Sequence, residues 1–84
     1  MDTAIDERID VGVVFTKSKL IPKFFCWRGR AFHIQEVTLT HKVRQGNVPW
    51  YFFSVVSRGS LYRLGFDSVS FSWILDRVVP METT

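Results

Sequence analysis

The feature of this chain that most constrains its fold is the two-residue period of its apolar side chains. Over residues 9–16, apolar residues alternate with a set that is polar or glycine except at Val14, and no window of the chain has the spacing of an amphipathic helix. Successive side chains of a β-strand point to opposite faces of a sheet, so a two-residue period is typical of strands. The chain is therefore predicted to be all-β.

Six strands are expected, because turn-forming residues separate the apolar runs. They cover residues 9–16, 23–27, 31–41, 50–57, 61–66 and 71–79. Gly29, Gly46 and Gly59 supply the positive φ angle that tight turns need, and Pro80 ends the last strand. Short strands joined by tight turns predict an antiparallel meander that closes into a small SH3-like or OB-like barrel or roll. The competing fold is a two-layer arrangement with a short N-terminal helix.

The third expected strand contains an irregularity. Phe32 and Ile34 fall on one face of a regular strand, whereas Val37 and Leu39 fall on the other. One extra residue near Gln35 places all four side chains on the same face, which is the effect of a β-bulge. We therefore predict a bulge there, which would also coil the strand and help the sheet to close.

Two of the expected strands are apolar on both faces, which a single closed sheet does not accommodate. Barrel strands should alternate between apolar residues inside and polar residues outside. In residues 23–27 and 50–57, apolar side chains fall on both faces, and aromatic residues make up 15% of the chain. The second face then needs a cover, from the N-terminal segment, a second copy or a ligand. Large exposed apolar patches are rare on monomers, so this surplus predicts an interaction surface.

The positive charge of the chain is concentrated in its middle. Residues 11–66 carry nine Lys or Arg and one Glu, whereas residues 1–10 and 67–84 are both net acidic. A basic body attracts anionic partners. Acidic ends that fold back on the body would neutralise part of that charge.

Length and composition predict one small domain with a modest core. Residues 9–79 should form this domain, between a flexible acidic segment over residues 1–8 and a frayed end over residues 80–84. Cys26 is the single cysteine, which excludes an internal disulfide and fits a reducing cytosol. The chain has no run of about 18 apolar residues and no leader pattern, so we expect a cytoplasmic protein without a membrane partner.

Residues that would indicate an enzyme are sparse. His33, His41 and Cys26 lack the close spacing of metal ligands. Cys26 and His33 lie on adjacent expected strands and would suit a nucleophile and its base, but the apolar neighbours of Cys26 favour a buried, inert thiol. There is no glycine-rich phosphate loop. The sequence therefore predicts a protein without catalytic activity, metal or cofactor.

Basic and aromatic residues cluster around two Arg-Gly pairs at expected hairpin tips. Small β-barrels bind single-stranded nucleic acid with such a combination, because cations follow the backbone while rings stack on bases. The plainer interpretation is that the rings belong to the core and the arginines are solvated turn residues. The candidates for binding nucleic acid or a protein partner are Trp27, Arg28, Arg30, Lys42, Arg44, Trp50, Tyr51, Arg58, Tyr62 and Arg63.

The stretch that begins at Pro22 reads PKFFCWRGRAFHI and fits the pattern Pro-x-x-Phe-x-Trp-x-Gly-Arg-x-[Tyr/Phe]-x-[Ile/Val]. With the Trp-containing strands that follow, it resembles a family of small uncharacterised prokaryotic β-domains. It is also similar to a hairpin in the C-terminal region of the Y-family-polymerase-like subunit of bacterial mutagenesis complexes. The 84 residues contain no counterpart of that subunit's catalytic domain. The resemblance therefore implies an accessory β-module over residues 9–79, with Trp27, Gly29, Arg30, Trp50 and Trp73 as the positions that carry the pattern.

Two functions remain open from the sequence. The first is a non-enzymatic protein–protein interaction module, either a homodimer or an accessory subunit, which would cover the surplus aromatic faces. The alternative is a nucleic-acid-binding β-barrel with basic hairpin tips. We favour the interaction module, because exposed apolar surface requires a cover whereas positive charge does not. No small-molecule substrate is indicated.

Overall fold

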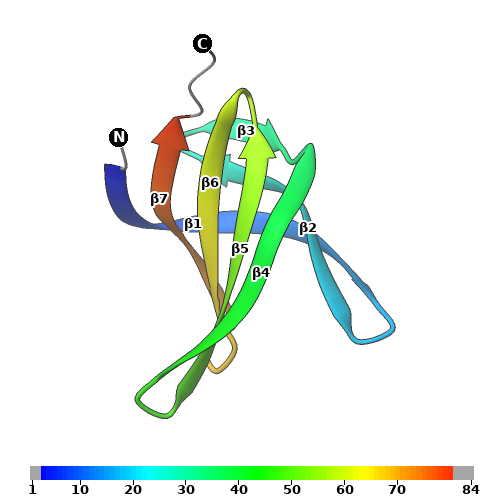
Figure 1. Cartoon of the computed structure of the whole chain (residues 1–84), viewed down its shortest axis with the longest axis vertical. Coiled ribbons are helices and arrows are strands. Elements are labelled where there is room, and N and C mark those ends of the chain that lie inside the picture. Colours follow the sequence, from blue (N-terminus) through cyan, green and yellow to red (C-terminus); the bar gives the residue numbers. More distant parts are fainter. Residues whose placement is uncertain (1–2, 81–84) are drawn as a thin grey trace.

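The computed structural model describes residues 3–80, which form seven antiparallel β-strands in one sheet (Figure 1). The strands are β1 (Thr3–Thr16), β2 (Lys19–Trp27), β3 (Arg30–His33), β4 (Glu36–Gln45), β5 (Val48–Ser57), β6 (Ser60–Asp67) and β7 (Ser72–Pro80). Their order across the sheet is β3-β2-β1-β7-β6-β5-β4. Within residues 3–80, β3 and β4 are the two edges, so the sheet does not close into a barrel.

The structure confirms the all-β antiparallel class and corrects the six-stranded closed barrel. The expected third strand is broken at Ile34 and Gln35 into β3 and β4, which gives seven strands. The change of face between Phe32 and Val37 occurs at the expected place. It is a strand break, however, which carries the chain from one edge of the sheet to the other. The bulge of this region lies between Val37 and Leu39.

The strands also extend further into polar sequence than expected. β1 begins at Thr3, so residues 3–8 are strand rather than a flexible segment. β2 begins at Lys19, directly after a two-residue turn, where a longer loop was expected. Pro80 is the last residue of β7, and the rest of the expected frayed end over residues 80–84 lies outside the described residues. The first two residues of the chain also lie outside them.

β1 belongs to both halves of the sheet. Its first part pairs with β7 as far as Ile9, which is opposite Trp73, and its second part pairs with β2 from Asp10 onward. Beyond this switch, the β1–β2 hairpin projects away from β7 (Figure 1). β1, β2 and β3 thus form a layer that crosses over the layer of β4 to β7.

The core lies between these two layers. Phe25 of β2 stacks on Phe32 of β3 with ring centroids 4.8 Å apart, and the Tyr62 ring meets them edge-on at 5.2 and 5.4 Å. Leu64 and Leu75 are fully buried in the same cluster. The other buried apolar residues of the core are Ile9, Phe53 and Val55. These side chains define the concave face of the sheet.

At one end of the molecule, the link between β3 and β4 joins the two layers. The backbone N–H of Ile34 donates a hydrogen bond of 2.9 Å to the carbonyl oxygen of Lys23 in β2. The N–H of Gln35 donates one of 2.8 Å to the carbonyl oxygen of Val56 in β5. We call this the closed end.

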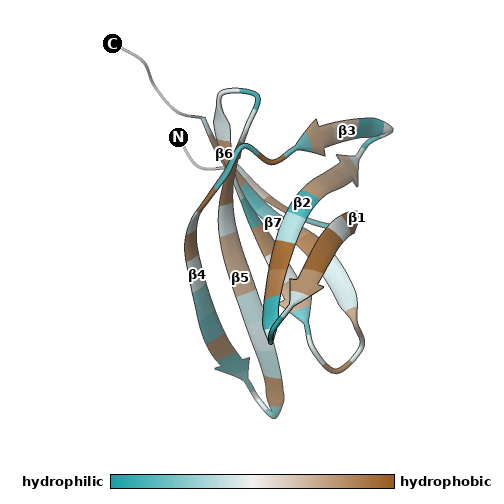
Figure 2. Ribbon diagram, turned by 90° about the vertical axis from the view of Figure 1, so that its right-hand side faces the viewer, coloured by the Kyte–Doolittle hydropathy of each residue, from teal (hydrophilic) through white to brown (hydrophobic). Residues whose placement is uncertain are grey.

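At the opposite end, the β1–β2 and β4–β5 hairpins splay apart, and we call this the open end (Figure 1). Figure 2 shows that the distal part of β1 is hydrophobic. Its side chains Val13, Val14 and Phe15 are exposed. The open end therefore retains apolar surface that the closed end buries.

Candidate functional site

An apolar groove lies at the open end, between the β1–β2 hairpin and the layer of β5, β6 and β7. Its volume is about 460 Å³, and every lining side chain except Ser18 is apolar or aromatic. The lining residues are Val13, Phe15, Ser18 and Leu20 from the hairpin, and Tyr51, Phe53, Phe66, Phe71 and Trp73 from the other layer. We call this cavity the apolar groove.

The strand register explains why these side chains meet. Phe15 is opposite Leu20 across β1 and β2, and Tyr51 is opposite Phe66 across β5 and β6. Residues directly opposite each other in an antiparallel ladder project from the same face. The concave face that forms the core at the closed end thus continues into the groove, where β3 no longer covers it.

Two large aromatic side chains of the groove are mostly exposed to solvent. Phe15 is 73% exposed and Phe71 is 78% exposed. The Phe71 ring meets the Phe66 ring with centroids 5.7 Å apart, so it extends the aromatic lining onto the surface. Contiguous exposed apolar surface of this kind marks interaction sites.

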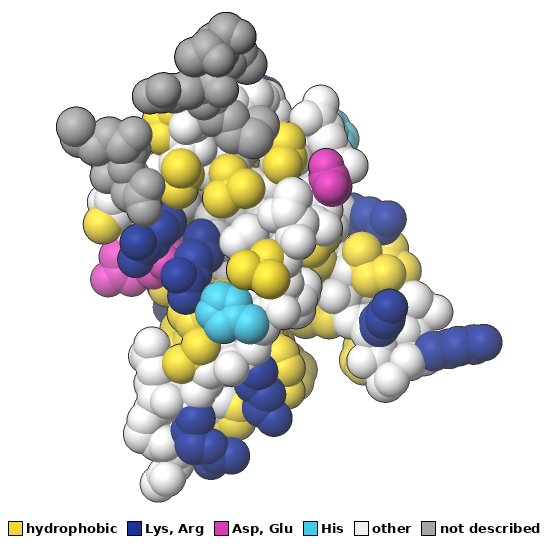
Figure 3. Space-filling view, viewed as in Figure 1, with side chains coloured by type: hydrophobic (Ala, Val, Ile, Leu, Met, Phe, Trp, Pro, Cys, Tyr) yellow, Lys and Arg dark blue, Asp and Glu magenta, His cyan; other side chains and the backbone are white. Residues whose placement is uncertain are grey.

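Basic residues lie on both sides of the groove. Lys17 and Lys19 are at the tip of the β1–β2 hairpin, and Lys42 and Arg44 are on β4. The Lys42 ammonium group is 5.7 Å from the centroid of the Tyr51 ring, a cation–π distance. Figure 3 shows Lys and Arg side chains on the two lower lobes of the molecule, a notch with hydrophobic atoms between them, and no Asp or Glu on either lobe in this view. The groove therefore has an apolar floor and a positive rim.

The two Arg-Gly tips are hairpin turns. Arg28 and Gly29 have φ angles of 52° and 76°, and Arg58 and Gly59 have φ angles of 50° and 74°. Two successive positive φ angles are the signature of a type I′ turn, whose twist matches that of the flanking strands. The glycines at these tips are therefore explained by turn geometry.

Both tip arginines have partners within the molecule. The Arg28 guanidinium bonds the Glu7 carboxylate at 2.7 Å, and this contact holds the pKa of Glu7 below its ordinary value. The Arg58 guanidinium donates to the carbonyl oxygen of Ala31 at 2.8 Å and lies 4.6 Å from the Phe32 ring centroid. Arg58 thereby fastens the β5–β6 tip to β3 at the closed end.

Three of the aromatic candidates pack against the protein itself. Tyr62 is 6% exposed and belongs to the core. The Trp27 indole donates its N–H to Glu7 at 2.9 Å, which contributes to the lowered pKa of that carboxyl. Trp50 lies on the convex face, where its ring stacks on Phe52 at 5.9 Å. Of the four aromatic candidates, Tyr51 alone lines the groove.

The convex face of β5 is covered by its own sheet, although the sequence suggested that it needs a partner. Phe52 is 5% exposed, because the His41 ring stacks on it at 5.6 Å and the Arg63 guanidinium lies 4.3 Å from its centroid. Gly65 is directly opposite, and a Cβ there would come within 2.8 Å of Phe52 Cε1. Arg63 also pairs with Asp76 at 3.5 Å. The side chains of His41, Arg63 and Trp50 thus cover Phe52 without a partner, and Gly65 leaves room for its ring.

On the convex side of β2, a glycine likewise leaves room for a phenylalanine ring, but this ring is less completely covered. Phe24 is opposite Gly12, where a Cβ would overlap the Phe24 ring, yet Phe24 remains 41% exposed. Larger exposed surface is found at Phe15 and Phe71, which the sequence reasoning did not single out. A run of apolar residues that ends at a polar turn, and a phenylalanine flanked by serines, are the signals that could have identified them.

The remaining candidates are distributed between the two ends. Lys42, Arg44 and Tyr51 lie at the open end, Lys42 over the Tyr51 ring. Arg30 is exposed at the start of β3, at the tip of the β2–β3 hairpin. The structure therefore brings Lys42 and Tyr51 together and keeps Arg30 apart from them.

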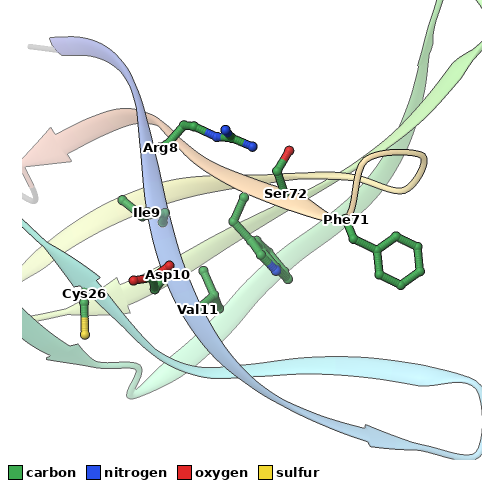
Figure 4. A pocket seen from close by; sticks show the side chains of 8 residues that line it. Arg8, Ile9, Asp10, Val11, Cys26, Phe71 and Ser72 are labelled. Atoms are coloured by element: carbon green, nitrogen blue, oxygen red, sulfur yellow. The ribbon is translucent and has the colours of Figure 1, made fainter.

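Cys26 is exposed, which corrects the expectation of a buried thiol. It projects from the convex side of β2, opposite in direction to the buried Phe25 beside it. With Arg8 and Asp10, Cys26 lines a second depression of about 640 Å³, and Figure 4 shows it at the far end from Phe71. In the described part of the chain, no three His, Cys, Asp or Glu side chains are grouped as a metal ion would require.

Comparisons with known proteins found no match: no family model, curated protein or solved structure matches this chain. The resemblance based on the pattern that starts at Pro22 therefore stays a prediction. Among the strands and turns that the structure describes, there is no helix long and apolar enough to cross a membrane. The function is inferred from the groove itself.

Proposed function

We propose that this protein is a non-enzymatic interaction module that binds a protein partner in the apolar groove. The observation that carries this proposal is the exposure of Phe15 and Phe71 on a groove lined by aromatic rings, in a molecule that covers Phe52 and Tyr62 by itself. Apolar side chains of a partner would remove this surface from water, which is favourable by about 25 cal/mol per Å².

The lining of the groove suits binding rather than chemistry. It contains no carboxylate, histidine or cysteine. General acid–base and nucleophilic catalysis depend mostly on such groups. A surface without them can bury a partner's side chains, and this supports an adaptor or accessory role.

Nucleic acid is the alternative partner, and it is less favoured because most of its expected contacts are engaged. Arg28, Arg58 and Arg63 bond other groups of the protein, and Tyr62 is in the core. Single-strand binding needs cations beside rings with an open face. Lys42, Arg44 and Tyr51 still offer such a combination at the rim of the groove.

Site-specific photo-cross-linking in cells tests the proposal. One variant of the full chain carries benzoyl-phenylalanine in place of Phe71, and a control carries it in place of Arg30 at the other end of the molecule. Both positions are exposed. We expect protein adducts at position 71 and few at position 30, whereas equal yields at the two positions, or no adduct at 71, would contradict the proposal. Sedimentation of the purified protein at micromolar concentration shows whether the partner is a second copy.

A further inference from the structure

Two edges of the sheet, in β2 and β4, face each other across a further cavity. β3 pairs with residues 24–27 of β2, so residues 19–23 have β1 as their one strand neighbour in the described sheet. β4 is the other edge and pairs with β5. A cavity of about 350 Å³ lies between these edges, and its lining consists of Lys19, Leu20, Ile21 and Pro22 of β2, Val37 and Thr40 of β4, and Phe53 of β5. We call this cavity the seam.

The two edges are not equally able to accept another strand. The β2 edge contains Pro22, which has no backbone N–H and is typical of strand edges. The β4 edge has a regular register from Leu39 to Gln45, without proline and beyond its bulge. Its outward N–H and C=O groups therefore form a template for an added strand, the mode of recognition called β-augmentation. In this geometry, β4 pairs and β2 is the wall.

The side chains at the seam specify what an added strand should carry. Alternate residues of such a strand point into the seam, where they meet Leu20, Pro22 and Phe53. These positions of the partner should be apolar. Further toward the open end, Lys42 and Arg44 project from the concave side of β4, because Lys42 is opposite Tyr51 and Arg44 follows two residues later. The partner residues that reach them should be acidic.

The charge of both walls supports an acidic partner. The cations are Lys17, Lys19 and Lys23 on the β1–β2 hairpin and Lys42 and Arg44 on β4, and within residues 3–80 none of them makes an ion pair. Within the described sheet, these two edges carry one acidic residue, Glu36, which lies at the start of β4 near the closed end. A second copy that paired through its own β4 would bring like charges together, which is unfavourable.

We propose that the seam takes an extended segment of another protein, with apolar residues at alternate positions and acidic residues at one end, which pairs with β4 as an eighth strand. This inference rests on the proposed function, because the seam adjoins the apolar groove and shares Leu20 and Phe53 with it. It adds the conformation and the charge of the bound segment. The added strand would fill the seam between the two edges and form its backbone hydrogen bonds with β4 alone.

A synthetic peptide of about ten residues, long enough to follow β4, tests the inference. The peptide alternates valine and threonine and has glutamates at both ends, which serve either strand direction. One control peptide has lysine in place of glutamate. A second is N-methylated at every residue between the glutamates, which keeps the side chains and removes the N–H donors of both strand edges. We expect the acidic peptide to slow amide hydrogen exchange in β4 between Leu39 and Gln45, and neither control to do so at the same concentration.

Charge-reversed variants of the full chain sharpen the test. Lys42→Glu combined with Arg44→Glu should weaken binding of the acidic peptide by about tenfold or more. The matched control, Arg8→Glu combined with Arg30→Glu, changes the net charge equally and should alter the affinity by less than about twofold, since both positions lie away from the seam. Equal losses in the two double variants would overturn the inference.

The remaining outcomes separate this inference from the proposed function. If the N-methylated peptide binds as tightly and shifts the signals of Phe71 and Trp73, the groove binds side chains without strand addition, and the inference fails while the proposed function stands. If no peptide binds, the inference fails, and cross-linking at position 71 decides the proposed function independently. Protection of β4 by a short thymidine oligonucleotide, or by a dimer without any peptide, would also overturn the inference and name the occupant as nucleic acid or a second copy.

Discussion

The closed and open ends of this molecule present the same face of the same hairpin to different surroundings. Phe25 and Phe15 both project from the concave side of the β1–β2 hairpin. Phe25, at the closed end, is fully buried against Phe32 and Tyr62, whereas Phe15, at the open end, is 73% exposed. The two residues are chemically identical, so their burial depends on where the second layer ends. The apolar groove is therefore the uncovered continuation of the core.

The largest expected effect is the difference in the free energy of unfolding between alanine variants of these two phenylalanines. Phe25→Ala should lower the free energy of unfolding by about 3–5 kcal/mol, because it leaves a cavity among stacked rings. Phe15→Ala should change it by less than about 0.5 kcal/mol, because the side chain is already solvated. Denaturant unfolding measures both values. Similar losses for the two variants would mean that the open end is packed as tightly as the closed end.

The two phenylalanine–glycine pairs on the convex face offer the next comparison. Gly65→Ala should cost about 1–3 kcal/mol, because the new methyl group would come within 2.8 Å of the buried Phe52 ring and within 3.1 Å of Ile74. Gly12→Ala should cost less than about 1 kcal/mol, because the exposed Phe24 ring can swing into solvent. Thermal unfolding of the two variants side by side tests this order, and a larger loss for Gly12→Ala would show that Phe24 is held as firmly as Phe52.

A smaller effect is expected at a hydrogen bond of the closed end. The buried Ser57 hydroxyl donates to the carbonyl oxygen of His33 at 2.7 Å. Ser57→Ala should cost about 1–2 kcal/mol, since it removes a part-buried hydrogen bond made by a fully buried side chain. Ser70→Ala, which removes an exposed hydroxyl near the open end, is the matched control and should stay within about 0.5 kcal/mol. Equal shifts of the denaturant midpoint in the two variants would mean that the Ser57 hydrogen bond stabilises the fold no more than the exposed Ser70 hydroxyl does.

The smallest effect is a pH dependence at the ion pair of the β2–β3 tip. Arg28 and then Trp27 lower the pKa of Glu7 below its ordinary value of 4.5. The folded state thus binds a proton at Glu7 less readily than the unfolded chain, so this stabilisation is present above about pH 4.5 and is lost as the pH falls through the folded-state pKa. Glu7→Gln should flatten the fall in stability between about pH 5 and 3.

The matched variant for this pH dependence is Arg28→Gln, which removes the ion-pair partner of the Glu7 carboxylate and should flatten the slope over the same range. A residual slope is expected even in Glu7→Gln, because the pKa of Asp67 is lowered too, chiefly by the backbone N–H of Ser70. Slopes that stay as in the unchanged protein in both the Glu7 and the Arg28 variants would show that the tip ion pair does not contribute.

The period of apolar residues was sufficient to predict the all-β antiparallel class, and the glycines predicted three of the hairpin tips. The pairs Arg28-Gly29 and Arg58-Gly59 are at hairpin tips, as expected, because glycine after a strand is a local signal. Closure of the sheet could not be predicted, since a bulge and a strand break at Ile34 produce the same change of face in the sequence. Only the three-dimensional path of the chain distinguishes them.

The candidate site could be predicted in part for a similar reason. Lys42, Arg44 and Tyr51 were identified from charge and aromatic content, and all three lie at the open end. The cover of Phe52 depends on its register with Gly65, and the groove beside Phe71 depends on how the β1–β2 hairpin lies against β5 to β7. Both are relations between distant segments, which no local pattern records.

The central claim is that the sheet is joined at one end and open at the other, and native-state amide hydrogen exchange on the dilute protein tests it most directly. The N–H groups of Ile34 and Gln35, which donate to β2 and β5, should be protected. Along β4 from Leu39 to Gln45, every second N–H should exchange rapidly, because it points away from β5. Protection of all β4 amides in the monomer would contradict the claim, because it would mean that the sheet closes on itself and leaves no groove.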